Sequence, residues 1–137
     1  MSFEDDLDTD LEPDFKDVDV LVNKKLHTFR FTQMSGIDWG SLVVYFPVRV
    51  GSELDQQYGY NIDGLCMEAA KRTGVRLEDG EPVEMAAESW AKLWPKLSGH
   101  DFISIKDTIW GLNEFWPGAA VDKAKKASRR KSRVKPD

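Results

Sequence analysis

Residues 18–46 read VDVLVNKKLHTFRFTQMSGIDWGSLVVYF, and the spacing of their apolar side chains changes part-way along. Over residues 18–33, alternating valines and a Phe/Thr-rich run lie on either side of the polar turn Asn23-Lys24-Lys25. That pattern predicts a β-hairpin, and because the turn carries no glycine its type stays open. After the hairpin, apolar residues recur at i, i+3, i+4 and i+7, which predicts a helix. An α+β fold that begins with a β-hairpin is therefore indicated.

The rest of the chain is predicted to be mainly helical. Four short helices are expected over about residues 35–46, 61–74, 82–94 and 101–115. Their starts are indicated, in the same order, by Ser35 with Asp38, by Asn61, by Pro82 and by Asp101. We expect a loop at 48–60 and a short extended piece at 75–77 between the helices, and a break at Pro117-Gly118 after the last one. The predicted class is then α+β, mainly α.

Charge divides the chain into three parts. Residues 1–22 carry nine acids and one lysine, a balance of −8, whereas residues 121–137 carry eight bases and two acids, a balance of +6. End segments of this kind are typical of disordered or interacting tails. We predict a disordered acidic arm at 1–17, a single α-rich globular domain at 18–117, and a basic tail at 118–137 that is partly helical. The two tails either only keep the protein in solution or bind a partner.

No catalytic, metal-binding or cofactor-binding pattern is present in the sequence, so an enzyme is not expected. The possible metal ligands His27, His100 and Cys66 stand at spacings that match no zinc motif. Phosphate loops, dinucleotide fingerprints and nucleophile elbows are also missing. No apolar run approaches the ~18 residues of a membrane span, and the acidic N-terminus does not resemble a secretory signal. The single cysteine fits a reducing compartment.

Aromatic residues near polar loops are the candidate interaction sites. Tyr58 and Tyr60 lie in a predicted loop, and Phe115 and Trp116 lie at a helix exit. Side chains of this type are frequent interface anchors. The alternative is that all four cover the core from outside. Nucleic acid is not an expected partner, because no aromatic residue is interleaved with the bases after Trp116.

Three groups of motifs resemble one protein family. They are FRFTQMSGIDW at residues 29–39, YGYN at 58–61 with EAA at 68–70, and LSGHDF at 97–102 with IWGLNE at 109–114. In this order they resemble the tail assembly chaperones of long-tailed bacteriophages that infect actinobacteria. The likeness covers roughly residues 26–117, and it concerns packing and capping residues rather than a catalytic signature.

The resemblance implies a non-catalytic protein of the host cytoplasm that binds the tape-measure protein. Such a chaperone keeps the tape-measure protein soluble until tail tube subunits polymerise around it, and it is not expected in the mature virion. Family members are often made in a short form and in a longer form produced by programmed ribosomal frameshifting. Lys125-Lys126 is compatible with A-rich slippery codons, in which case this chain is the short form. The implied partners are the tape-measure protein, the longer frameshifted form and, as a further candidate, the tail tube protein.

Two other function classes are alternatives at the level of sequence. One is a structural virion component such as a head–tail or tail adaptor protein, which would be retained in the finished particle. The other is a small nucleic-acid-binding protein that acts through its basic tail, for which salt-sensitive DNA retention is the expected signature.

Overall fold

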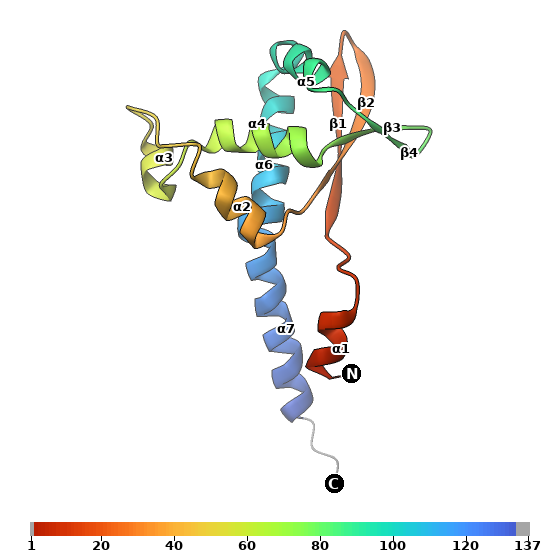
Figure 1. Ribbon diagram of the computed structural model, residues 1–137, viewed down its shortest axis with the longest axis vertical. Coiled ribbons are helices and arrows are strands. Elements are labelled where there is room, and N and C mark those ends of the chain that lie inside the picture. Colours follow the sequence, from red (N-terminus) through yellow and green to blue (C-terminus); the bar gives the residue numbers. More distant parts are fainter. Residues whose placement is uncertain (1, 134–137) are drawn as a thin grey trace.

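A four-stranded antiparallel sheet and the helices around it form the computed structural model, which describes residues 2–133 (Figure 1). The strands lie in the order β1-β2-β3-β4 and comprise β1 (Phe15–Val22), β2 (Lys25–Thr32), β3 (Val75–Glu78) and β4 (Glu81–Glu84). The predicted α+β class is confirmed. The sheet consists of two hairpins, however, where the sequence predicts one.

The first hairpin begins at Phe15, earlier than the predicted start at residue 18. β1 and β2 pair in antiparallel register along their full lengths. Asn23 and Lys24 both have positive φ, at 50° and 66°, which is the conformation of a type I′ turn. The twist of such a turn matches the twist of the flanking strands, and asparagine tolerates the left-handed conformation. The turn therefore forms without a glycine.

The second hairpin replaces part of a predicted helix. The extended piece expected at 75–77 is confirmed as β3, which pairs with β4 across the Asp79-Gly80 turn. The prediction that Pro82 opens a helix is wrong, because Pro82 lies in β4 opposite Leu77. β4 is an edge strand, and a residue without an N–H is tolerated there.

Helices occupy most of the remaining chain. They are α1 (Phe3–Asp8), α2 (Gly36–Val43), α3 (Glu53–Tyr58), α4 (Ile62–Thr73), α5 (Ala87–Leu93), the 3₁₀ turn η1 (Trp94–Lys96), α6 (Gly99–Trp110), the π-helical segment η2 (Gly111–Phe115) and α7 (Trp116–Arg133). The predicted caps of α2 and α4 are confirmed, since Ser35 and Asn61 accept hydrogen bonds from backbone N–H groups of the first turn. Most of the predicted basic tail is helical in α7; residues 134–137 lie outside the described residues.

Two short helices lie where the sequence predicts none. α1 lies within the arm at 1–17 that is predicted to be disordered, and it begins with a capping box between Ser2 and Asp5. α3 lies within the predicted loop at 48–60, where Ser52 caps its start and Gly59, with a φ of 90°, ends it. The prediction that the acidic arm is fully disordered is thus wrong, because the arm contains α1 and the first residues of β1.

The start of α6 also differs from the prediction. Ser98 is the N-cap and accepts a hydrogen bond from the Asp101 N–H at 3.1 Å, so Asp101 lies inside the first turn. The Asp101 carboxylate instead accepts from the Leu21 N–H at 3.0 Å, and this hydrogen bond lowers the pKa of Asp101. The contact fixes the start of α6 to β1.

One face of the sheet packs against α4, α5 and α6. The buried apolar residues are Val18, Val20, Phe29, Phe31, Trp39, Leu42, Tyr60, Ile62, Leu65, Cys66, Ala69, Ala70, Trp90, Leu93, Ile105, Ile109 and Leu112. Gly74 ends α4 at a crowded point, where a Cβ would lie 2.7 Å from Phe31 and 2.8 Å from Trp90. Figure 1 shows α7 projecting from this body, with α1 at the same end of the molecule and α5 at the opposite end.

Candidate interaction surface

η2 lets the chain pass Pro117 without ending the helix. In an uninterrupted α-helix the Pro117 ring would collide with the Asn113 carbonyl and leave it without an N–H partner. Instead the Trp116 N–H donates to the Gly111 carbonyl, and Pro117 falls in the first turn of α7, where its lack of an N–H does not matter. The predicted break at Pro117-Gly118 is therefore wrong.

Three aromatic rings from three elements meet beside η2. The centroid of the Tyr58 ring lies 4.7 Å from that of Trp110 and 6.1 Å from that of Phe115, and the Trp110 and Phe115 centroids are 5.0 Å apart. The interplanar angles of 75–88° make all three pairs edge-to-face, an arrangement that the ring quadrupoles favour. Tyr58 and Phe115 keep part of their surface exposed. The structure thus brings two of the four predicted site residues together.

Tyr60 does not belong to the exposed set. Only 7% of the residue is exposed, and its hydroxyl accepts a hydrogen bond from Trp110 Nε1 at 2.8 Å. Burial raises the pKa of Tyr60 to about 12, although the Trp110 hydrogen bond opposes the shift. The prediction that Tyr60 is an exposed anchor is wrong, and this residue supports the aromatic rings from within the core.

Trp116, the fourth predicted site residue, is partly exposed and lies against its own helix. Its ring covers Gly111, where an added Cβ would overlap the ring carbons. Lys16 Nζ lies 4.9 Å from the centroid of the same ring, at cation–π distance. Trp116 therefore links the start of β1 to the start of α7, and only part of its surface is free for a partner.

Exposed apolar side chains gather on α2, α3 and the segment between them. Tyr45 is 78% exposed, and the full set, which we call the α2–α3 surface, is Ile37, Val44, Tyr45, Val48, Val50, Leu54 and Tyr58. Exposed apolar residues concentrated in one part of a small protein are typical of an interaction site. Apart from Tyr58, sequence reasoning missed this surface.

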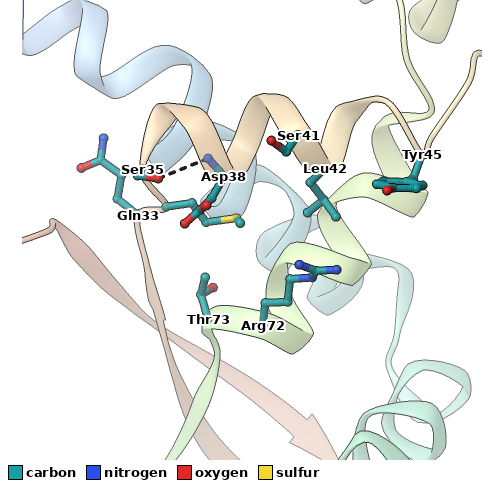
Figure 2. A pocket seen from close by; sticks show the side chains of 9 residues that line it. Gln33, Ser35, Asp38, Ser41, Leu42, Tyr45, Arg72 and Thr73 are labelled. Carbon is teal, nitrogen blue, oxygen red and sulfur yellow. Dashed lines mark hydrogen bonds between the residues drawn. The ribbon is translucent and has the colours of Figure 1, made fainter.

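A groove lies beside this surface, between α2 and the C-terminal end of α4 (Figure 2). It has a volume of about 570 Å³, and a second hollow of about 430 Å³ shares Leu42, Tyr45 and Arg72 with it. Figure 2 shows Arg72 reaching from α4 toward Leu42 and Tyr45, with Asp38 on the α2 side. The groove therefore combines a few apolar contacts, from Met34, Leu42 and Tyr45, with a mostly polar lining. Its cation, Arg72, is paired with Glu68 of the same helix at 3.1 Å.

A buried carboxylate fixes α3 to the start of α4. Asp55 is fully buried and accepts hydrogen bonds from the Arg49 backbone N–H at 3.1 Å, from Arg49 Nε at 2.8 Å and Nη2 at 3.0 Å, and from the Ile62 N–H at 3.3 Å. Arg49 also donates to Asp63, and Lys106 Nζ lies 3.5 Å from Asp63. The Arg49 hydrogen bonds hold the pKa of Asp55 well below its usual range, against the effect of burial. This network positions α3, and with it Tyr58.

The described side chains that could bind a metal or act as a nucleophile either have a structural role or lie apart from one another. Within residues 2–133, no three His, Cys, Asp or Glu side chains are placed to hold a metal ion. Burial raises the pKa of the Cys66 thiol to about 12, so it is not a nucleophile at neutral pH. His100 Nδ1 lies 3.3 Å from the Asp101 carboxylate, which is already bound to the Leu21 N–H. In the same part of the chain, every helix is too short or too polar to cross a bilayer.

No family model, curated protein or solved structure matches this chain. The surfaces described above are therefore the basis for assigning a function.

Proposed function

We propose that this protein is a tail assembly chaperone of a long-tailed bacteriophage, which holds the tape-measure protein in solution in the host cytoplasm during tail tube polymerisation. The observation that supports this is the α2–α3 surface, whose apolar side chains are exposed beside a groove between two helices. Grooves and apolar surfaces of this kind suit an amphipathic helix as ligand. A tape-measure protein is a long helical chain that exposes apolar residues and would aggregate alone.

The charged ends of the chain supply a second property that such a chaperone needs. α1 and residues 118–130 of α7 are exposed, the first acidic and the second basic. High charge at a protein surface opposes aggregation. A complex that carries these two segments would therefore stay in solution even with a long apolar chain attached.

Replacing Val44, Tyr45 and Val50 together by Ser is expected to weaken binding of the tape-measure protein by about 100-fold, because burying each apolar side chain against the partner contributes ~1 kcal/mol. All three side chains are exposed, so the fold should be retained. The measurement is co-purification with a tagged tape-measure protein after co-expression, followed by titration of the purified proteins.

A matched control replaces Leu21, Leu26 and Ile103 by Ser. These three residues are also exposed, but they lie on β1, β2 and α6, away from the α2–α3 surface. Binding should be unchanged in this control. An equal loss of binding in both variants, or no loss in either, would contradict the proposed surface.

Particle composition separates this proposal from a structural virion protein. A chaperone leaves once the tail tube has formed, so mass spectrometry of purified particles should detect this protein far below one copy per particle. A head–tail adaptor would be found in whole-number stoichiometry, and that result would refute the chaperone assignment.

A further inference from the structure

A third, separate hollow lies under α5, away from the α2–α3 surface. It has a volume of about 290 Å³ and opens between the β2–β3 part of the sheet and α5 with η1. Phe29, Met85 and Leu93 form its apolar floor, and Arg76, Lys92 and Lys96 stand at its sides. We call it the cationic cleft.

Two of the three cations that line the cleft have no ion-pair partner among the described residues. Lys92 and Lys96 are spaced i, i+4, are exposed, and form no ion pair with any described residue. Arg76 pairs with Glu78 at 3.5 Å. No acid is among the described residues that line the cleft, and His27 is the remaining titratable group there. A fitting occupant is therefore an apolar side chain flanked by carboxylates.

The acidic arm of this same protein has that chemistry. Phe3, Leu7 and Leu11 are 70%, 66% and 80% exposed, so their apolar surface has no cover. Each of them has an acid on at least one side in the sequence. Phe3 and Leu7 are spaced i, i+4 in α1, which places them on one side of that helix.

The arm is held away from the cleft of its own chain. The cleft includes Val22, at the end of β1 opposite to Phe15, roughly 24 Å away at 3.4 Å per residue. At the Phe15 end, the Arg30 guanidinium lies 4.2 Å from the Phe15 ring centroid, and Lys16 lies over Trp116. Figure 1 shows α1 at the end of the molecule opposite to α5.

From these observations we propose that the acidic arm of one copy docks in the cationic cleft of a second copy. The apolar side chains of the arm cover the cleft floor, and its carboxylates pair with Lys92 and Lys96. Because arm and cleft lie at opposite ends, two antiparallel copies satisfy both contacts at once. The contact requires no tape-measure protein and does not depend on the proposed function.

Sedimentation velocity of the full-length protein tests this contact. Wild type should self-associate at 50 mM salt and less so at 500 mM salt, because surface charge is screened over a few ångströms at the higher concentration. Lys92→Glu with Lys96→Glu should weaken self-association by at least ~10-fold, as two attractive charge pairs become repulsive. Leu7→Ser with Leu11→Ser should weaken it similarly, although no charge is changed.

The matched control places the same charge change on α7, as Lys123→Glu with Lys126→Glu, and should leave self-association intact. Adding Asp6→Lys and Asp8→Lys to the Lys92/Lys96 variant should restore it. A wild-type protein that stays monomeric at 50 mM salt would overturn the proposal. So would loss of association in the α7 variant but not in the cleft variant, since the arm would then bind the basic helix.

Discussion

Replacing Trp90 by Ala is expected to lower the free energy of unfolding by about 3–5 kcal/mol, the usual range for removing a large aromatic side chain from a core. Trp90 is 1% exposed, and its ring joins three elements. Its centroid lies 5.6 Å from Phe29 and 6.1 Å from Phe31 on β2, and 5.5 Å from Trp94 in η1. Phe29 and Phe31 also pack on each other, and Trp94 packs on Phe102, so these rings are held in place beside the space that Trp90 would leave.

Urea denaturation followed by far-ultraviolet circular dichroism measures this loss without depending on tryptophan fluorescence. Trp90→Phe is the matched variant, since it keeps a ring and removes an indole N–H that is buried without a hydrogen-bond partner among the described residues. The free energy of unfolding of Trp90→Phe should fall by less than half as much as that of Trp90→Ala. A Trp90→Ala protein within about 1 kcal/mol of wild type would show that this ring cluster does not hold α5 to the sheet.

Local sequence signals were sufficient for the elements whose ends are set by neighbouring residues. The hairpin followed from alternating valines, and the starts of α2 and α4 followed from Ser35 and Asn61, because a cap acts within one turn. The buried stripe of α4, which includes Leu65, Cys66 and Ala69, was predictable from its period for the same reason.

The wrong predictions concern residues whose surroundings are determined by tertiary contacts. The sequence predicts that Pro82 opens a helix and that Pro117 ends one, but Pro82 lies on a sheet edge and Pro117 follows the π-helical segment η2. Neither the sheet edge nor η2 has a signature within the surrounding residues. A usable signal was overlooked at α3, where Ser52 and Asp55 have the spacing of a capping pair.

The candidate site was only partly predictable. Tyr58 and Phe115 are exposed and in contact, but Tyr60 is buried although it lies two residues from Tyr58. The direction of each ring depends on where α6 passes, which the sequence of the loop does not contain. The α2–α3 surface was missed because Val44 and Tyr45 directly follow core residues of α2, and apolar residues in that position are expected to be buried.

Asp55 is the residue whose loss should most disturb the position of α3. Its carboxylate receives three hydrogen bonds from Arg49 and one from Ile62, so Asp55→Asn removes the charge that faces Arg49 and replaces an acceptor oxygen with a donor. We expect the Tm to fall by about 10 °C at pH 7. Asp63→Asn is the control, because Asp63 binds the same Arg49 at a part-exposed site, and its Tm should fall by only ~2 °C.

Acid should reduce the difference in Tm between wild type and Asp55→Asn. A carboxyl group whose pKa is depressed by folding stabilises the folded state above its unfolded pKa of about 3.9, and this stabilisation is lost as the pH falls below that value. The difference should therefore be constant from pH 7 to about pH 5 and should narrow toward pH 3. The Tm of the Asp55→Asn variant should still fall somewhat in acid, because the pKa of Asp101 is also lowered by folding. A Tm difference that stays constant down to pH 3 would show that Arg49 does not hold Asp55 as a carboxylate.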